Sequence, residues 1–336
     1  MKRWLPLLLI ISLLVPALLV GCTSGDQEAA PGTNGEEADE KKIDFPTKPV
    51  EITVLFGAGG GQDLIVRKLA EIGEEKLGQP FVVVNRTGAG GAVGYTYVKD
   101  QKPDGYNIVA SSNSISTAYH KGNMDFDYRT FRGIAMVVKE PVSIAVKADA
   151  PWKTLDELFA YAKEHPGEIK IGNSGVGSFT HLTGVAVSKF YGADVVHVPF
   201  GKGLAVSALL GEKIDASVQL AAEVMNQVEA GTVRLLAVTG DKRIEAAPDV
   251  PTLKEYGYDG NLTLYRSFHA PKDTPDEVIA ILEEVFKYAV ESEEFAEFAK
   301  ELGVQVSFMG AEELDEFVAK DDADTARLME LIGLKK

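Results

Sequence analysis

The sequence predicts an α/β protein of two lobes with a ligand cleft between them. Its globular part is longer than one small domain needs, apolar strand runs alternate with amphipathic helical segments, and two glycine-rich loops each join a strand run to a helical segment. We expect lobe 1 to comprise residues 46–146 and 267–336, and lobe 2 to comprise residues 147–266. Two crossings between the lobes, near Val146 and Ser267, are typical of a binder that closes about a hinge.

The N-terminal residues 1–21 have the pattern of a signal peptide. A basic start is followed by a largely apolar run, which ends at Gly21 immediately before Cys22. A small residue before a cysteine resembles the lipobox of bacterial lipoproteins, so we predict that Cys22 is acylated and anchors an extracytoplasmic protein to a membrane. Cys22 is the only cysteine, which excludes a disulfide within one chain. The alternative is an ordinary secretory signal with a chance cysteine.

Residues 22–45 predict a flexible acidic tether. Between residues 23 and 44 the chain is rich in Gly, Glu, Asp, Ala and Thr, has no aromatic residue, and has Ile43 as its one β-branched aliphatic. Such a segment has too little apolar surface to form a core. We expect the folded region to begin at Pro46.

Strands and helices alternate through the first part of the globular region. The strand at residues 81–84 is apolar throughout, which is typical of a parallel strand covered on both faces. A helix is predicted before it, with apolar residues at helical spacing up to Gly78, the expected C-cap. The strands predicted here are residues 50–56, 81–84 and 106–110.

A second set of elements begins after Pro151. Thr154 and Glu157 have the spacing of a capping box at the start of a helix. The strands predicted here are residues 169–172, 195–198, 216–219 and 235–238.

The C-terminal region is predicted to be helical. Thr274, Pro275 and Glu277 indicate a second capping box, and an apolar stripe follows it. Because no strand run of comparable strength occurs among these last helices, we expect them to pack on lobe 1.

The first glycine-rich loop, residues 55–63 (LFGAGGGQD), has four glycines in five positions. Bare peptide N–H groups and the positive end of the following helix dipole favour a bound anion there. A dinucleotide fingerprint counted from Gly57 would require glycine at Gln62, so that motif is excluded. A tight turn with no ligand is the structural alternative.

The second glycine-rich loop, residues 172–182 (GNSGVGSFTHL), adds hydroxyl and amide donors to bare backbone. Ser178 and Thr180 are equally consistent with helix N-caps. One such loop in each lobe would suit a small dianion with one carboxylate held by each lobe.

Composition and motifs argue against other functions. The formal net charge of −16 disfavours nucleic acid or anionic membrane surfaces as partners. We expect no cofactor and no metal, since the five histidines show no pair at zinc-ligand spacing, and no G-x-S-x-G elbow indicates a hydrolase. Asp63 could be a catalytic base, but a helix cap in the first turn is the favoured interpretation. An exported enzyme and an adhesive lipoprotein remain the alternatives to a binding protein.

Eight motifs in order resemble the extracytoplasmic receptors of tripartite tricarboxylate transporters, the Bug or TctC-like family. The resemblance covers residues 46–336 and implies a type II periplasmic-binding-protein-like fold, a carboxylate ligand in the cleft, and delivery to a membrane permease. We expect a monomer that is not an enzyme. The motifs are PTKPVEITVLFGAGGGQD, VVVNRTGAGGAVG, PDGYNIVASS, GNSGVGSFTHL, VVHVPFGKG, GTVRLLAVTGDKR, PDVPTLKEYG and APKDTP.

The resemblance also implies ligand contacts, mainly peptide N–H groups, hydroxyls and bridging waters. Those carried over from lobe 1 are Phe56, Ala58, Gly59, Gly60, Gln62, Ser111, Ser112 and Asn113. Those carried over from lobe 2 are Asn173, Ser174, Val176, Ser178, Thr180, His181 and Gln219.

Some positions depart from the family pattern. Gln219 stands where amino-acid binders have Asp, which disfavours a ligand with an ammonium group. Gln62 stands where Thr or a small residue is common, and Thr87 replaces a usual proline. We therefore expect a di- or tricarboxylate, with another small carboxylate, aromatic or amino acid, as the alternative. Arg266 could pair with a ligand carboxylate or only bridge the lobes, and the second is slightly favoured.

Overall fold

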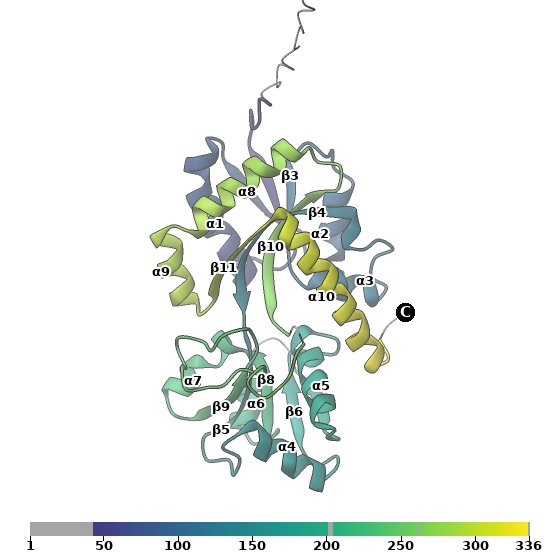
Figure 1. Ribbon diagram of the computed structural model, residues 1–336, viewed down its shortest axis with the longest axis vertical. Helices are drawn as coiled ribbons and strands as arrows, with labels where there is room; N and C mark the ends of the chain where they lie inside the picture. The colour runs from purple at the N-terminus through teal and green to yellow at the C-terminus, as the bar shows by residue number, and fades with distance from the viewer. Residues whose placement is uncertain (1–42, 201–203, 261, 335–336) are drawn as a thin grey trace, which may run out of the picture. The chain divides into compact units, whose positions relative to one another are not determined.

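Two β-sheets, one in each lobe, organise the residues that the structure describes. The computed structural model describes residues 43–200, 204–260 and 262–334 (Figure 1). The predicted signal peptide, Cys22 and the tether as far as residue 42 lie outside the described residues. Within them, each sheet is covered by helices on both of its faces.

The sheet of lobe 1 has six described strands in the order β11-β4-β10-β3-β1-β2. β1 is parallel to β2 and to β3, whereas β10 is antiparallel to β3 and β4, and β11 is antiparallel to β4. The strands are β1 (Val50–Val54), β2 (Phe81–Asn85), β3 (Asn107–Ser111), β4 (Phe131–Glu140), β10 (Leu264–Pro271) and β11 (Gln305–Gly310).

The β2 strand differs from its expected environment. It is the edge strand of the sheet, and the Val82 side chain is 45% exposed. The strand at residues 81–84 was predicted to be covered on both faces. This prediction is wrong for Val82, because a side chain on an edge strand is flanked by a neighbouring strand on one side only.

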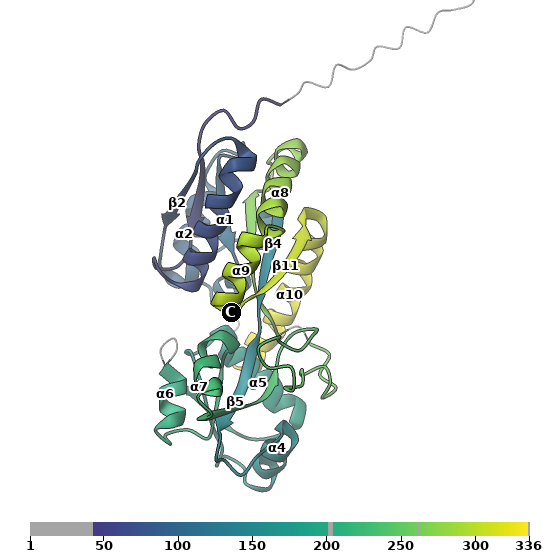
Figure 2. The same ribbon diagram turned by 90° about the vertical axis from the view of Figure 1, so that its left-hand side faces the viewer.

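Two groups of helices cover the two faces of this sheet. On one face α1 (Gly61–Leu77), α8 (Asp276–Val290) and α9 (Glu293–Leu302) share a core with the strands, and Figure 2 shows these helices next to one another. On the other face lie α2 (Ala92–Lys99), α3 (Ser114–His120) and the first half of α10 (Ala311–Leu331). The apolar stripe of α8 that the sequence predicts is buried in the first of these cores.

The sheet of lobe 2 has five described strands in the order β7-β6-β8-β5-β9. These are β5 (Val142–Lys147), β6 (Lys170–Asn173), β7 (Val196–Pro199), β8 (Ala216–Leu220) and β9 (Val233–Val238). Its helices are α4 (Leu155–Glu164), α5 (Phe179–Tyr191), α6 (Leu204–Leu210) and α7 (Met225–Glu229). α4 and α5 pack on one face, and α6 and α7 on the other.

The chain crosses between the sheets at other residues than expected. β4 ends at Glu140 in the sheet of lobe 1, and β5 begins at Val142 in the sheet of lobe 2, so the first crossing lies at Pro141 and not near Val146. The return is complete at Leu264, where β10 begins, and not near Ser267. These boundaries were missed because neither β4, β5 nor β10 was recognised as a strand from its sequence.

Helix α10 makes a third connection, which was not predicted from the sequence. Its Leu314 and Val318 are buried in lobe 1, whereas Leu328 and Met329 are buried in the core of lobe 2. Residues 267–336 were expected to lie wholly in lobe 1, and that assignment is therefore wrong for the end of α10. This connection is one continuous helix of 21 residues.

The predicted helix ends have mixed outcomes. Gly78 is the left-handed C-cap of α1, with φ of 72°. Thr154 caps α4 by accepting the Glu157 N–H at 3.2 Å. Thr274 caps nothing, because its hydroxyl donates to the Pro271 carbonyl at 2.8 Å and α8 begins two residues later.

The folded region begins before Pro46. Ile43 and Phe45 pack against the core of lobe 1, and the rings of Phe45 and Tyr106 lie 4.9 Å apart. The last residues assigned to the tether are thus part of the lobe, because their apolar side chains pack against its core.

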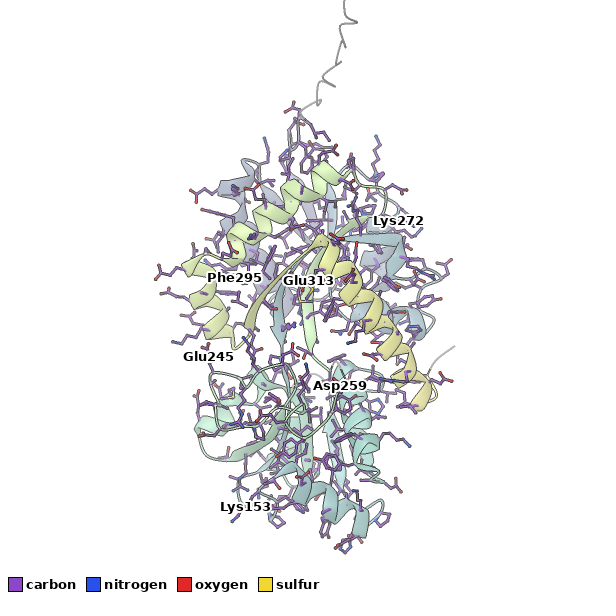
Figure 3. The ribbon with its side chains drawn as sticks, in the orientation of Figure 1. Lys153, Glu245, Asp259, Lys272, Phe295 and Glu313 are labelled. Carbon is purple, nitrogen blue, oxygen red and sulfur yellow. The ribbon has the colours of Figure 1, made fainter. Side chains whose placement is uncertain are left out.

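Many charged side chains lie on the outside of the described fold. Lys153, Glu245, Asp259 and Glu313 are at its surface, whereas Phe295 is buried (Figure 3). Within the described ranges, we find no helix with the length and apolar character needed to cross a membrane.

Candidate ligand-binding site

A cavity of about 360 Å³ is lined by residues of both lobes. The glycine-rich loop before α1 and the glycine-rich loop before α5 both reach it. Of the fifteen predicted contacts, eight line the cavity: Phe56, Gly60, Gln62, Ser112, Asn113, Ser174, Ser178 and Thr180. Seven do not: Ala58, Gly59, Ser111, Asn173, Val176, His181 and Gln219.

The first loop uses part of its own backbone internally. The Gly59 N–H donates to the Asp63 carboxylate at 2.9 Å, and the Gly60 N–H donates to the Gly57 carbonyl at 3.2 Å. Gly60 and Gly61 line the cavity at the start of α1, where the first-turn N–H groups have no acceptor within the helix. An anion in the cavity would therefore meet the helix N-terminus rather than the Gly59 amide.

Asp63 holds this loop in shape. Its buried carboxylate accepts hydrogen bonds from the Gly59 N–H, from Arg67 at 3.0 Å and from the Asn85 amide at 2.8 Å. Burial raises the pKa of Asp63, but these donors outweigh burial and hold the pKa below 3.8. Asp63 is consequently ionised at neutral pH and does not line the cavity. Both observations favour a helix cap over a catalytic base as the role of Asp63.

Gln62 fastens the loop to the sheet. Its Oε1 accepts the Leu55 N–H at 3.3 Å, and its Nε2 donates to the Ala110 carbonyl at 3.0 Å. The side-chain amide thus joins the ends of β1 and β3. A small residue, which the family pattern has here, would lose both bonds.

The residues after β3 form a network of hydroxyl and amide groups. Ser111 lies behind the wall, where its hydroxyl is 2.8 Å from the Tyr95 hydroxyl. Ser112 lines the cavity, and its hydroxyl donates to Ser114 at 3.0 Å. The Asn113 amide is bonded on both sides, donating to Asp321 at 2.9 Å and accepting the Tyr265 N–H at 3.2 Å.

The second loop combines a helix cap with an internal turn. Ser178 is the N-cap of α5 and accepts the His181 N–H at 3.2 Å, as the capping alternative predicts. Thr180 accepts the Ser174 N–H at 3.0 Å, and the Asn173 side chain accepts the Gly175 N–H at 3.0 Å. These bonds fix the loop before any ligand binds.

Asn173 and Gln219 lie just behind the cavity wall. Gln219 Oε1 accepts the Ser174 hydroxyl at 2.9 Å. Both side chains are buried, and the Asn173 Nδ2 and Gln219 Nε2 atoms have no acceptor among the described residues. Two unsatisfied buried donors are costly, so this layer is suited to an additional acceptor beside Ser174.

His181 is neutral in this arrangement. Burial, together with the nearby Lys121 charge, lowers the pKa of His181 below 6.5. Its Nδ1 accepts the Gly177 N–H at 3.0 Å. His181 therefore stabilises the second loop and offers no positive charge to an anion.

Charged residues of the cavity wall were largely missed at the level of sequence. Lys121 and Glu223 line it, as does Arg266, whose guanidinium is bonded to Glu140. Thr117 and Lys121 follow Asn113 at intervals of four, which places them on one side of α3 and could have identified them. The other lining residues that were not among the fifteen predicted contacts are Gly61, Gly90, Ser114, Gly177, Phe179, Leu220 and Leu264.

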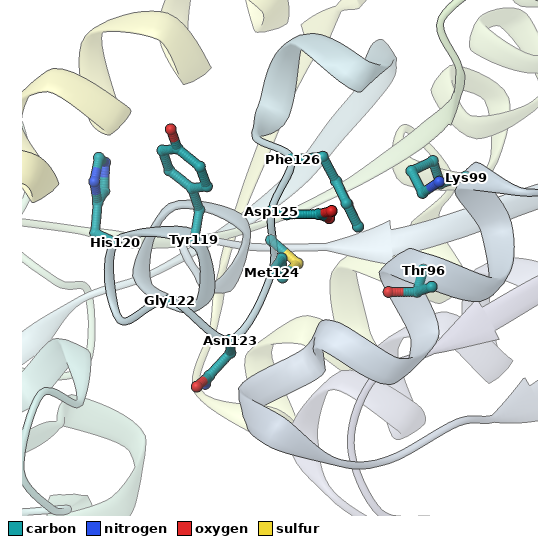
Figure 4. Close-up of a pocket in the computed structure, with 9 residues that line it drawn as sticks. All are labelled: Thr96, Lys99, Tyr119, His120, Gly122, Asn123, Met124, Asp125 and Phe126. Atoms are coloured by element: carbon teal, nitrogen blue, oxygen red, sulfur yellow. The ribbon is translucent and has the colours of Figure 1, made fainter. Parts of the chain in front are cut away.

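A larger hollow, of about 750 Å³, is a poorer candidate (Figure 4). All nine of its lining residues belong to lobe 1, and they spread from His120 and Tyr119 at one end to Lys99 at the other. Two of its basic side chains already have partners, since Lys99 lies 2.6 Å from Asp100 and His120 lies 3.0 Å from Asp322. Among the described residues, no group of His, Cys, Asp and Glu is arranged to hold a metal.

Comparisons with known proteins agree with this fold. The model of the tripartite tricarboxylate transporter family receptor matches residues 65–334. The chain is 30% identical to the UPF0065 protein in the gbd 5′ region of Cupriavidus necator, over 92% of this chain and 94% of that protein. It is 31% identical to protein BugT of Bordetella pertussis, over 79% of this chain and 83% of that protein.

Solved structures with the same fold include relatives above 25% identity. A TctC solute binding protein from Polaromonas has a TM-score of 0.80 and 32% identity, covering 85% of this chain and 99% of that chain. R. palustris Rpa4515, solved with adipate, has a TM-score of 0.72 and 26% identity, covering 86% of this chain and 99% of that chain.

Proposed function

Because this chain belongs to the tripartite tricarboxylate transporter receptor family, we propose that it captures a small di- or tricarboxylate between its lobes and delivers it to the membrane permease of such a transporter. The family is one of solute-binding receptors with a periplasmic-binding-protein fold. One observation supports the ligand class most directly: the N-termini of α1 and α5, from different lobes, border one cavity.

The size of the cavity suits a short dicarboxylate. Its volume of about 360 Å³ falls at the lower end of the range for small-molecule sites. Rpa4515 holds adipate, a six-carbon dicarboxylate. We propose a ligand of four to six carbons, or citrate, without an α-ammonium group.

An amino acid is the second candidate, and one residue favours it. Glu223 adds a carboxylate to the cavity wall, and this group would attract a ligand ammonium. Gln219, however, supplies no charge at the position where amino-acid binders have Asp. A panel of candidate ligands should therefore include amino dicarboxylates beside their deaminated counterparts.

Thermal melting of the purified protein with such a panel tests the proposed ligand class. At about a hundred times Kd, a bound ligand stabilises the folded state by about 2.7 kcal/mol. For lobes of this size, the melting temperature should rise by about 5 to 10 °C. Methyl esters of the active acid should give no rise, and glutamate and aspartate should do worse than their deaminated counterparts. The proposal would be overturned if amino acids, sugars or cations raised the melting temperature and no di- or tricarboxylate did.

Membrane attachment through Cys22 is part of the proposal. Support comes from the sequence, where an apolar run ends at a small residue followed by the single cysteine. Cys22→Ser should abolish labelling with a radioactive fatty acid and release the protein from membranes. Retention of the variant on membranes would contradict an acyl anchor and leave the ligand proposal untouched.

A further inference from the structure

Lys121 joins the two lobes at the edge of the cavity. It follows the last residue of α3 in lobe 1, and its Nζ donates to the Val176 carbonyl of the second glycine-rich loop at 3.2 Å. The loop approaches it closely, because a Cβ built on Gly177 would lie 2.5 Å from Lys121 Cε. Gly177 has φ of +67°, so glycine there serves both the turn and the space that Lys121 occupies.

The Lys121 ammonium has no acidic partner in the described part of the protein. Among residues 43–200, 204–260 and 262–334, no carboxylate lies within 4 Å of its Nζ. The side chain is partly buried, and burial lowers the pKa of Lys121. A charge withdrawn from water is normally balanced by an opposite charge, and here the protein contributes one carbonyl oxygen.

Arg266, the other described cation that lines this cavity, is already balanced. Its Nε is bonded to the Glu140 carboxylate, and both side chains are almost fully buried. An anionic ligand would have to compete with Glu140 for Arg266. Lys121 can instead keep the Val176 carbonyl on one of its three N–H groups and direct another into the cavity.

We propose that Lys121 binds one carboxylate of the ligand and thereby determines the preference of this site for a dianion over a neutral or singly charged analogue. This inference rests on the proposed function and adds the residue that attracts the charge. The Val176 carbonyl keeps the ammonium at the cavity rim, so the ligand meets a cation that is already positioned. Local attraction of this kind would offset the unfavourable net charge of −16 at short range.

The test is calorimetric titration of the full chain with succinate, malate, adipate and citrate. Lys121→Met removes the charge but keeps much of the length, Lys121→Gln keeps a donor for the Val176 carbonyl, and Lys121→Arg keeps the charge. We expect Met and Gln to weaken binding of the best ligand by about 10- to 100-fold, the range of one charge-assisted hydrogen bond. Arg should remain within a few-fold of wild type.

Salt dependence separates the charge from a structural role of Lys121. Wild-type affinity should fall as sodium chloride is raised from about 20 to about 300 mM, and the fall should be smaller in Lys121→Met. Lys99→Met is the matched control, because Lys99 is a lysine of the same lobe outside the cavity and is paired with Asp100. It should bind and respond to salt as wild type does.

The outcomes distinguish this inference from the proposed function. If no carboxylate binds the wild type, the proposed function fails and the role of Lys121 with it. If wild type binds but Lys121→Gln keeps wild-type affinity, or Lys121→Met keeps the wild-type salt dependence, only the role of Lys121 is refuted. Circular dichroism of each variant shows whether a loss of binding is a loss of folding. If Lys121→Met and Lys121→Gln do not fold, Lys121→Arg decides whether a positive charge at this position supports binding.

Discussion

The Asn113 side-chain amide nitrogen lies 2.9 Å from Asp321 Oδ1, and this bond joins the cavity wall to helix α10. Both side chains are 2% exposed or less. Burial raises the pKa of Asp321 to about 8, with a further contribution from the nearby Asp322 and Asp324 carboxylates, while the Asn113 bond opposes it. The carboxyl group is thus largely protonated in the folded protein at neutral pH and ionised in the unfolded chain.

This difference makes stability depend on the Asp321 proton. A folded-state pKa above the unfolded value means that the folded state binds more protons between about pH 4 and about 8, so stability falls as pH rises through that window. Asp321→Asn keeps an acceptor for Asn113 and cannot ionise. As pH rises from about 6.5 to about 8, the unfolding free energy of this variant should therefore increase by about 2 kcal/mol relative to that of wild type. Urea denaturation at each pH measures this difference.

A surface control belongs with that experiment. Asp273→Asn, at an exposed position, should leave the pH profile of wild type unchanged. A constant difference between Asp321→Asn and wild type at every pH would show that the carboxyl group does not titrate in this window.

His269 should give the opposite dependence on pH. It is buried in β10, its Nε2 lies 2.9 Å from the Ser267 hydroxyl, and burial lowers the pKa of His269 to about 4. Its contribution to stability is present above about pH 6.5 and is lost as pH falls toward about 4, because the unfolded chain binds the proton first. His269→Gln should therefore lose less stability than wild type between about pH 6.5 and 5, by about 2 kcal/mol. Identical acid profiles would mean that His269 is protonated without cost in the folded state.

Gly105 is predicted to resist substitution. Its φ is +81°, and an added Cβ would lie 2.2 Å from a Val278 methyl group and 3.0 Å from the Phe45 ring. Gly105→Ala combines left-handed strain with an overlap that costs about 1 to 3 kcal/mol. Gly167→Ala, with φ of +76° and open space around it, measures the strain alone. Equal unfolding free energies for the two variants would show that α8 and Phe45 yield without cost.

The end of α10 should be required for the stability of lobe 2. Met329 is buried in the core of lobe 2, whereas Leu331 on the same helix is 50% exposed. Met329→Ala should lower the unfolding free energy by about 2 to 4 kcal/mol, and Leu331→Ala by much less. Hydrogen exchange should show the loss of protection in β5 and β8. Protection lost only in lobe 1 would contradict this packing.

Local patterns predicted the parts of the fold that local forces determine. The strand–glycine–helix pattern before α1 and before α5 was recognised because residues adjacent in the sequence determine a glycine turn and the start of a helix. The Gly78 C-cap and the Thr154 N-cap were recognised for the same reason. Eight of the predicted contact residues line one cavity, although nothing in the sequence shows how closely the two loops approach.

The missed features depend on contacts between distant residues. β10 contains Arg266, Ser267 and His269, which conceal its strand character, and their partners in the fold include Glu140. Asn173 and Gln219 were predicted to touch the ligand, but they lie one layer behind the wall because Ser174 stands in front of Gln219. Lys121 was missed because its partner, the Val176 carbonyl, belongs to the other lobe.

The path of α10 also sets the order in which the chain can fold. All described strands of lobe 2 precede Leu264, yet Leu328 and Met329 supply part of its core. As the chain emerges in order from its N-terminus, these strands appear well before that helix, and they must wait with an uncovered apolar surface. Lobe 2 therefore completes its core only after the chain has returned through lobe 1, so the lobe that is built in the middle of the sequence is finished last.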